Sequence, residues 1–349
     1  MIKYLGSKRR LVPVLGAIAT AVEAKSALDL FTGTTRVAQE FKRRGLRVTA
    51  VDTASYAKVL ADTYIASDAT EVDKDHLSDA IDELNRLPGQ PGYFTETFCV
   101  RSRYFQPHNG ARVDAIRDRI ELDYAGTALY PILLTALMLA ADRADSTTGL
   151  QMAYLKSWAQ RSYKDLHISC PELLSGPGAA VMGDALQVTP QLGRVDLAYL
   201  DPPYNQHRYF TNYHVWETLV RWDAPAHYGV ACKRVDAREA GTHSDFNSKR
   251  TMPGALRAAI GATAAETLIV SYNNEAWVTA DELLQWCGEG REAATLLEFD
   301  SKRYVGAQIG IHDPNGRKVG RVSHLRNVEY LVVAGSREMV AAAVDSSRT

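Results

Sequence analysis

The segment "SALDLFTGTTRVAQEFKRRGLRVTAVD", residues 26–52, contains a complete strand, turn, helix and strand. Residues 26–31 form a short apolar run and residues 46–52 form a second one. Between them, residues 35–44 place Val, Ala and Phe on one helical face, and Gly45 ends that helix. Such a unit predicts two parallel strands joined by a right-handed crossover. The sequence therefore predicts an α/β fold whose ligands bind at the carboxyl ends of its strands.

Further segments resemble strands, and they lie at residues 179–185, 195–201, 267–273, 294–300 and 327–334. Helices are expected over residues 9–24 and around residues 215–221. Strands and helices thus alternate on both sides of the middle of the chain. The last strands suit an antiparallel edge of the sheet.

Residues 68–175 have a different pattern, in which charged helical stretches alternate with Tyr, Phe and Arg clusters without a strand rhythm. We therefore predict one α/β domain, residues 1–67 plus 176–335, interrupted by a mostly helical insertion at residues 68–175. Residues 336–349 are polar, and we expect a tail that ends in disorder.

The chain has 349 residues and a formal net charge of −1, so no global basic field indicates a nucleic-acid partner. Its four cysteines are far apart and lack the spacing of a metal or redox motif, which favours reduced thiols in the cytoplasm and no metal. The basic and apolar N-terminus resembles an export signal, but Pro13 and Gly16 interrupt it and a helix suits it better. The apolar run at residues 128–141 is too short to span a bilayer, so no membrane partner is expected.

The turn after the first strand suits a ligand. Gly33 lets backbone approach a ligand closely, and the following helix starts with free N–H groups. The turn has neither a G-x-G-x-x-G pattern nor the Lys of a P-loop. Asp52, at the end of the second strand, can accept two hydrogen bonds from ribose hydroxyls. Together they indicate an adenosine-containing ligand without a pyrophosphate, although Asp52 could instead cap the helix that begins in "TASYA".

The stretch "DLAYLDPPYNQHRYF", residues 196–210, ends an apolar strand on Asp201. The Asp201 carboxylate and the Pro202 carbonyl can both accept hydrogen bonds from an amine on a planar ring, which frees the nitrogen lone pair. Pro202 and Pro203 fix the backbone, and Tyr204 can stack on the ring. A base in a duplex must be flipped out to reach such a site. The alternative is an ordinary strand end and turn.

In chain order, "KYLGSK", "DLFTGT", "VD", "GDA" and "DPPY" resemble the motifs of S-adenosylmethionine-dependent DNA N6-adenine methyltransferases of the Dam-like (D12) class. The resemblance implies a Rossmann-like class I methyltransferase sheet with a mostly helical target-recognition insertion. It also implies that Asp201, Pro202, Pro203 and Tyr204 are catalytic. The cofactor-binding residues that it implies are Tyr4, Lys8, Asp29, Phe31, Gly33, Thr34, Asp52, Asp184 and Asp201.

The chain departs from the family pattern in places. Relatives more often have Trp and a Gly-Gly pair where this chain has Tyr4, Gly6 and Ser7, and two threonines follow Gly33. Asp184 alone would be interpreted as a turn aspartate. Asp stands at position 201, where relatives acting on cytosine N4 often have Ser, and this favours adenine.

Three stretches are candidates for DNA contact. "RYFTNYHVWETLVRWD" resembles the region after the catalytic motif in methyltransferases of restriction systems with asymmetric sites, and "FNSKRTMPGAL" and "RSRYFQPHNGAR" mix basic and polar or aromatic residues. From the first we expect Tyr209, Tyr213, His214 and Arg208 at a base pocket or DNA face, with ordinary packing as the alternative. The other predicted DNA contacts are Arg101, Arg103, His108, Asn247, Lys249 and Arg250, each of which could also be simply solvated.

We therefore expect a DNA adenine N6-methyltransferase that uses S-adenosylmethionine, acts on double-stranded DNA and belongs to a restriction-modification system whose separate endonuclease is not physically required. No Pro-Cys nucleophile motif is present, which favours direct transfer. The alternatives are the same chemistry on cytosine N4 or an RNA base, a non-catalytic DNA-binding regulator, and, more distantly, a nicotinamide dehydrogenase.

Overall fold

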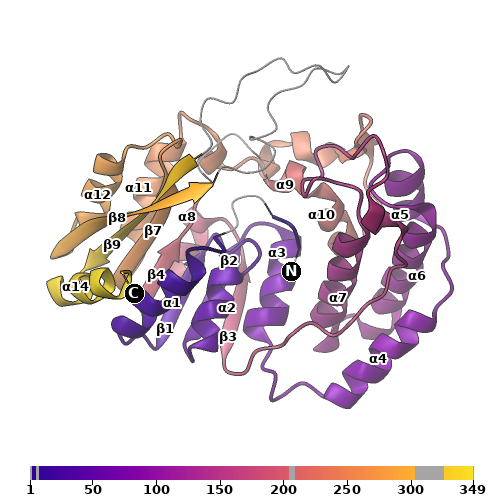
Figure 1. The fold of residues 1–349 in the computed structure, drawn as a ribbon, viewed down its shortest axis with the longest axis horizontal. Coiled ribbons are helices and arrows are strands. Elements are labelled where there is room, and N and C mark those ends of the chain that lie inside the picture. The colour runs from indigo at the N-terminus through magenta and orange to yellow at the C-terminus, as the bar shows by residue number, and fades with distance from the viewer. Residues whose placement is uncertain (1, 5–7, 204–208, 303–325, 349) are drawn as a thin grey trace. The chain divides into compact units, whose positions relative to one another are not determined.

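The computed structural model describes residues 2–4, 8–203, 209–302 and 326–348 (Figure 1). The chain divides into two compact units. Unit 1 comprises Met1–Tyr4, Thr32–Gly183 and His207–Ser244, and unit 2 comprises Leu5–Phe31, Asp184–Gln206 and Asp245–Thr349. Both units combine strands with helices and contain parallel strand pairs, as the sequence predicts.

Unit 2 holds the larger set of strands, which are β1 (Ser26–Leu30), β4 (Val195–Leu200), β7 (Ala265–Asn273), β9 (Arg326–Gly335) and β8 (Ala293–Lys302), in this spatial order. β1, β4 and β7 are parallel, whereas β9 runs antiparallel to both β7 and β8. The expected antiparallel edge is therefore confirmed. Leu30 pairs with Leu200, so the chain leaves β1 and β4 at the same edge of the sheet.

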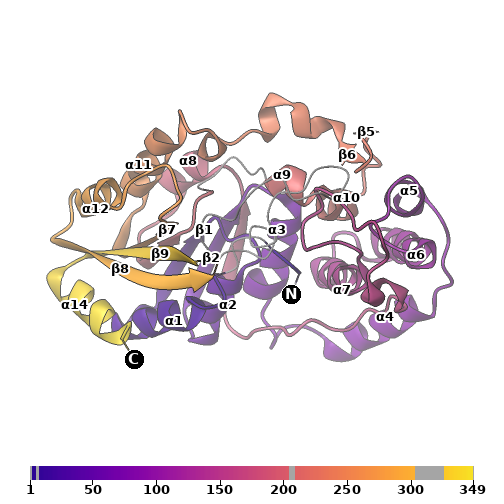
Figure 2. The same ribbon diagram turned by 45° about the horizontal axis from the view of Figure 1, so that its top comes forward.

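Helices cover both faces of these strands (Figures 1 and 2). α11 (Met252–Ala262) and α12 (Ala280–Gly288) lie on one face, and α1 (Val12–Ala21) and α14 (Arg337–Ser346) lie on the other. The short α8 (Ala185–Val188) contacts α11. Buried parallel strands such as β4 need this double cover, because they are apolar on both faces.

Most of the segment after Ser336, for which we expect a polar tail that ends in disorder, forms the helix α14. Ser336 caps this helix by accepting a hydrogen bond from the Met339 N–H at 3.2 Å. Val340 and Ala343 are three residues apart, so they share one face of the helix, and both are buried. The polar composition concealed this short amphipathic pattern.

Unit 1 contains the parallel strands β2 (Arg47–Asp52) and β3 (Gly178–Met182), with Asp52 opposite Met182. Its α-helices are α2 (Arg36–Arg43), α3 (Ser55–Ala61), α4 (Lys74–Arg86), α5 (Tyr93–Thr95), α6 (Pro107–Tyr124), α7 (Leu129–Ala144), α9 (Tyr209–Asn212) and α10 (His214–Arg221). A two-stranded ribbon, β5 (His227–Tyr228) and β6 (Lys233–Arg234), follows α10. Residues 68–175 contribute α4 to α7 and no assigned strand.

The apolar run at residues 128–141 forms most of α7, which is buried nearly all round. A helix that is apolar on all sides belongs in a protein core or a membrane. Here α7 packs against α3, α6 and α10 within unit 1. Pro131 is tolerated because it lies in the first turn of the helix. Among the helices of the described residues, none has both the length and the apolar character needed to cross a membrane.

Candidate functional site

Asp201 follows directly after β4 in unit 2 and forms an ion pair with Lys8. The Asp201 Oδ1 and Lys8 Nζ atoms are 3.1 Å apart, and the same Nζ lies 3.1 Å from Glu329 Oε2 on β9. The Lys8 side chain is only 7% exposed. Two carboxylates thus share one buried ammonium group at the edge where β4 ends.

This arrangement changes the acidity of Asp201. Burial raises the pKa of its carboxyl group to about 6; the Lys8 ammonium opposes this shift and the Glu329 carboxylate adds to it. Desolvation disfavours the charged form of a carboxylic acid, and the cation restores only part of the loss. Such a strongly perturbed group beside a strand end is typical of functional sites.

The prolines of the same motif lie beside this group in the chain. Pro202 is buried and Pro203 is half-buried. Neither has a backbone N–H, so this stretch offers carbonyl acceptors without competing donors. The predicted residues Tyr204 and Arg208 lie outside the described residues.

Phe31, at the end of β1, has a left-handed backbone with φ 71°. This conformation is costly for a residue with a large side chain and concentrates at functional sites. Its ring packs edge-on against Phe246, with centroids 4.8 Å apart. Asp29, two residues earlier, is buried within β1. Sequence reasoning did not single out Phe246, although it directly precedes the predicted Asn247.

The remaining predicted residues of unit 2 have ordinary surroundings. Asp184 accepts a hydrogen bond from the Leu186 N–H at 2.9 Å and so caps α8, the contact expected of a turn aspartate. Asn247 is half-buried, and Lys249 and Arg250 are exposed just before α11.

Unit 1 contains the other cofactor-site candidates. The Asp52 carboxylate accepts hydrogen bonds from the Gly33 N–H at 2.8 Å and from the Ala54 N–H at 3.0 Å. Burial raises the pKa of Asp52, and these backbone donors oppose the shift. Each carboxylate oxygen can accept a further hydrogen bond, so the Asp52 contacts leave capacity for a diol. The alternative, in which Asp52 caps the following helix, accounts for the Ala54 contact alone.

Gly33 adopts a left-handed backbone with φ +53° beside the ring of Tyr4. A Cβ at this position would lie 3.1–3.2 Å from the Tyr4 ring and hydroxyl, closer than carbon atoms normally approach. The turn therefore favours glycine for two independent reasons. Thr34, the next residue, is buried.

Tyr4 is stacked in a cluster of tyrosines. Its ring is nearly parallel to those of Tyr213, at 4.7 Å between centroids, and Tyr209, at 5.3 Å. Tyr56, from α3, is tilted against Tyr213 at 5.8 Å. Desolvation within the cluster raises the pKa of the Tyr4 hydroxyl well above its usual value, so the ring is neutral. Flat aromatic faces beside a glycine turn and a strand-end carboxylate fit an adenosine-type cofactor.

Glu217 of α10 holds this cluster to α3. Its Oε2 atom accepts hydrogen bonds from the backbone N–H groups of Ser55, at 3.0 Å, and Tyr56, at 3.4 Å. The residue is 2% exposed, and burial raises its pKa. A buried carboxylate at the start of a helix satisfies N–H groups that otherwise have no partner. No sequence pattern distinguished Glu217 from a solvated helix residue.

The predicted DNA contacts of unit 1 differ in exposure. Tyr213 and His214 are fully buried; the His214 Nε2 lies 3.0 Å from the Gln151 carbonyl oxygen, and burial lowers the His214 pKa to about 3. Packing, the alternative interpretation, describes His214 well. At the surface, Arg101 pairs with Glu96 at 2.9 Å, and His108 lies 3.6 Å from Asp165.

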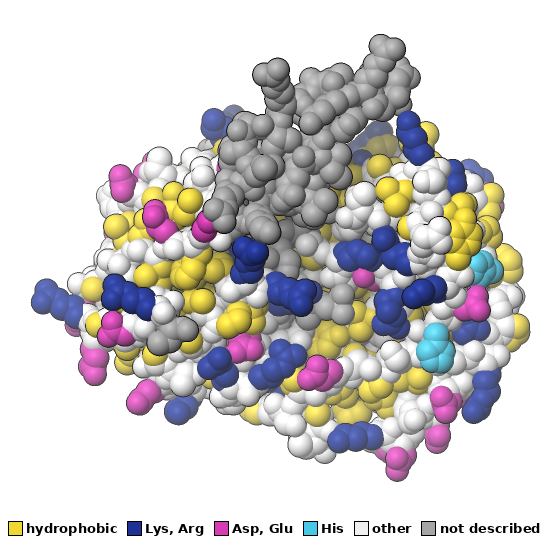
Figure 3. All heavy atoms as spheres, viewed as in Figure 1, with side chains coloured by type: hydrophobic (Ala, Val, Ile, Leu, Met, Phe, Trp, Pro, Cys, Tyr) yellow, Lys and Arg dark blue, Asp and Glu magenta, His cyan; other side chains and the backbone are white. Residues whose placement is uncertain are grey.

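Arg103 forms a more elaborate contact at the surface of unit 1. Its guanidinium lies 4.7 Å from the centre of the Trp158 ring, and its Nη1 donates to the Lys156 carbonyl at 2.8 Å. On the face that Figure 3 shows, Lys and Arg side chains lie over unit 1, interspersed with acidic side chains. Mixed cationic and aromatic surface is typical of nucleic-acid contact.

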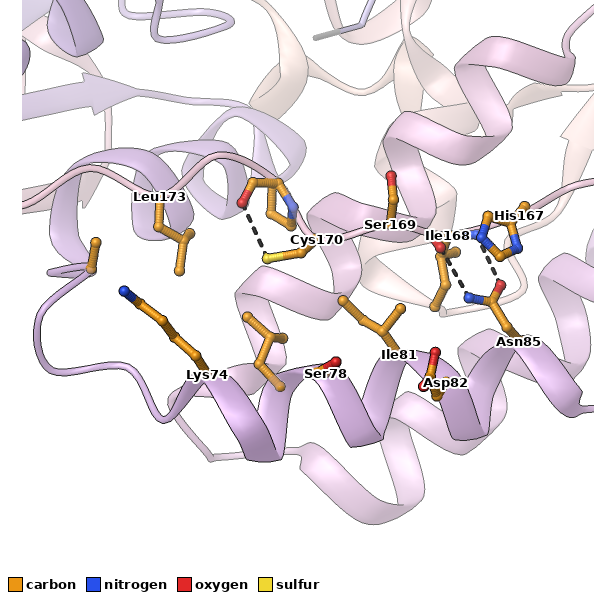
Figure 4. Close-up of a pocket in the computed structure, with 13 residues that line it drawn as sticks. Lys74, Ser78, Ile81, Asp82, Asn85, His167, Ile168, Ser169, Cys170 and Leu173 are labelled. Carbon is orange, nitrogen blue, oxygen red and sulfur yellow. Dashed lines mark hydrogen bonds between the residues drawn. The ribbon is translucent and has the colours of Figure 1, made fainter.

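A cavity of about 460 Å³ in unit 1 is separate from these groups (Figure 4). It lies between α4 and residues 167–173, and none of the predicted site residues lines it. Asn85 joins its two walls by exchanging hydrogen bonds with the Ile168 backbone, both at 3.0 Å.

Comparisons with known proteins identify the family. A model of the D12 class N6 adenine-specific DNA methyltransferases matches residues 4–255. The type II methyltransferase M.NlaIII of Neisseria lactamica is 28% identical over 295 residues, which cover 80% of this chain and 86% of that protein. The modification methylase StsI of Streptococcus sanguinis is 28% identical over 299 residues, which cover 80% of this chain and 45% of that longer protein.

The match includes the glycine turn, Asp52 and the "DPPY" motif, and it confirms the resemblance seen in the sequence. Because the family model spans well over half of the chain, this protein belongs to the D12 class of N6 adenine-specific DNA methyltransferases, which use S-adenosylmethionine to methylate DNA.

Proposed function

We propose that this protein is the modification methyltransferase of a restriction-modification system and methylates the N6 amine of an adenine flipped out of double-stranded DNA. The observation that carries the proposal is the buried group of Asp201, Lys8 and Glu329 at the end of β4. The curated relatives are named as modification methylases and type II methyltransferases, which supports a modification role. A partner endonuclease would act as a separate protein, in the cytoplasm.

Asp201 and Pro202 would hold the target amine. An ionised Asp201 accepts one N–H of the amine, and the Pro202 carbonyl accepts the other. These two acceptors localise the lone pair on nitrogen and point it at the methyl group. Lys8 keeps Asp201 ionised and fixes its orientation. Tyr204 would stack on the flipped ring, with Pro203 fixing the backbone between them.

Asp52, Gly33 and Tyr4 fit the cofactor. Asp52 would accept hydrogen bonds from ribose hydroxyls, while Gly33 gives room at the turn. When bound, S-adenosylmethionine supplies a methyl group on a sulfonium that is already reactive. The protein then contributes mainly proximity and orientation. The other residues that we propose at the cofactor are Lys8, Asp29, Phe31, Thr34, Asp184 and Asp201.

DNA would contact both units. We propose that residues 68–175 form the target-recognition region and that residues 1–67 and 176–335 form the catalytic domain. Arg103 and its Trp158 partner supply a cationic and aromatic surface for this. The other residues that we propose at the DNA are Arg101, His108, Arg208, Tyr213, Asn247, Lys249 and Arg250.

Mass analysis of nucleosides tests the target base directly. Unmethylated double-stranded DNA is incubated with the protein and S-adenosylmethionine, then digested to nucleosides. We expect the digest to contain N6-methyl-2′-deoxyadenosine. A product containing only N4-methylcytosine, or methylation of RNA in preference to DNA, would contradict the proposed target.

The rate of methyl transfer is expected to depend on pH through Asp201. Its pKa is raised to about 6, and its ionised form is a much stronger acceptor for the amine N–H than its protonated form. The rate should therefore increase as the pH rises through about 6 and fall below it. Single-turnover rates between about pH 5 and pH 8 report this ionisation in the enzyme–substrate complex. A flat profile over this range would contradict the assignment.

A further inference from the structure

The N-terminal stretch that carries Tyr4 is clamped by the end of α7. The Lys3 backbone N–H donates to Asp142 Oδ1 at 3.1 Å, and the Lys3 ammonium lies 3.1 Å from Asp142 Oδ2. The same ammonium pairs with Asp145 Oδ1 at 3.1 Å. The two carboxylate side chains are 9% and 3% exposed. Because Tyr4 is the next residue, these contacts fix the position of the backbone that carries the stacked Tyr4 ring.

Asp145 also holds a second cation. Arg161 donates to the same Oδ1 atom from Nε at 2.8 Å and from Nη2 at 2.6 Å. The other carboxylate oxygen accepts from the Thr147 hydroxyl at 2.6 Å. One buried carboxylate thus joins Lys3 to Arg161, which are far apart in the sequence. Breaking one side of such a group leaves the remaining charges poorly compensated.

Arg161 belongs to the surface segment of residues 155–163, which carries Trp158. The segment is pinned to Ser146, the neighbour of Asp145: Leu155 N–H donates to the Ser146 carbonyl and Ala159 N–H to its hydroxyl, both at 3.0 Å. Arg103 lies over the Trp158 ring on this surface. A change in the position of this segment therefore affects Asp145 through both backbone and side-chain contacts.

We propose that Asp145 is a positioning residue that couples DNA bound on residues 155–163 to the cofactor bound beside Tyr4. DNA contact orders the segment and holds Arg161 on Asp145, which fixes Lys3 and places Tyr4 for the cofactor. Less of the free energy of cofactor binding is then lost in ordering the protein, so DNA and cofactor bind cooperatively. This inference rests on the roles proposed above for Tyr4 and for the Arg103 and Trp158 surface.

Calorimetric titration tests the coupling without turnover. S-adenosylhomocysteine, which carries no methyl group, is titrated into the protein with and without sheared unmethylated plasmid DNA. We expect DNA to tighten binding by about 5-fold or more in the wild type, at the lower end of typical coupling. In Asp145→Asn the DNA effect should be lost. Asp123→Asn, which removes a carboxylate from an exposed ion pair with Arg119, should keep it.

A second variant keeps the coupling testable if Asp145→Asn fails to fold. Arg161→Gln leaves the contact between Lys3 and Asp145 in place, so its affinity without DNA should stay unchanged while the DNA effect is lost. Coupling that survives in either variant, or is absent from the wild type, overturns the inference. A DNA affinity unchanged by Trp158→Ala would instead overturn the DNA role of the segment.

Discussion

Asp201→Ala is expected to lower the rate of methyl transfer by about 10²- to 10³-fold while leaving DNA affinity largely unchanged. The magnitude is that found when one preorganised hydrogen-bonding group is removed from an active site. In the wild type, Lys8 aligns the Asp201 carboxylate at the end of β4, so under the proposed mechanism this carboxylate would accept the amine N–H without reorganising. Removing it leaves the adenine lone pair delocalised into the ring. Single-turnover assays at saturating cofactor and DNA measure the effect on chemistry alone.

Glu329→Gln is the matched control for this variant. It removes the other carboxylate that shares Lys8 but leaves Asp201 in place. Because the Glu329 charge contributes to the raised pKa of Asp201, its removal should move the pH profile to lower pH while the maximal rate is kept. Unchanged methylation in Asp201→Ala would contradict the catalytic assignment. Loss of DNA binding in Asp201→Ala would show that the side chain serves binding rather than the chemical step.

The elements around the first turn were predictable because their signals are local. The apolar runs before and after α2 specify β1 and β2, and Gly33 marks a turn that favours glycine beside Tyr4. The sequence of residues 195–201 likewise predicted a strand, which is β4, followed directly by Asp201. Within such a unit, sequence spacing determines which residues end their strands at the same edge.

The partners of these residues could not be predicted, because they depend on contacts between distant segments. Glu329 reaches Lys8 only through the antiparallel pairing of β9 with β7. Glu217 reaches the start of α3 from 161 residues away along the chain. Neither residue belongs to a recognisable motif. In the sequence alone, an acidic residue within a helix or strand is indistinguishable from a solvated side chain, because only the tertiary structure buries it.

The second large effect concerns the cofactor, since Asp52→Ala is expected to weaken binding of S-adenosylhomocysteine by about 10- to 100-fold. Hydrogen bonds to a charged acceptor contribute about 1.5–3 kcal/mol each, and about 1.4 kcal/mol corresponds to a tenfold change in affinity. The variant also removes the acceptor of the Gly33 N–H, which loosens the turn. Calorimetric titration gives the affinity, and thermal unfolding of the same samples gives the change in stability.

Asp73→Ala separates a ligand role for Asp52 from a capping role. Asp73 caps α4 in the same unit by accepting a hydrogen bond from the His76 N–H at 3.0 Å. Its removal should cost about 1 kcal/mol of stability, as is usual for a lost helix cap, with no change in cofactor affinity. If Asp52→Ala behaved like Asp73→Ala, losing stability but keeping its affinity for S-adenosylhomocysteine, Asp52 would be a capping residue and the cofactor would have to be held by other groups.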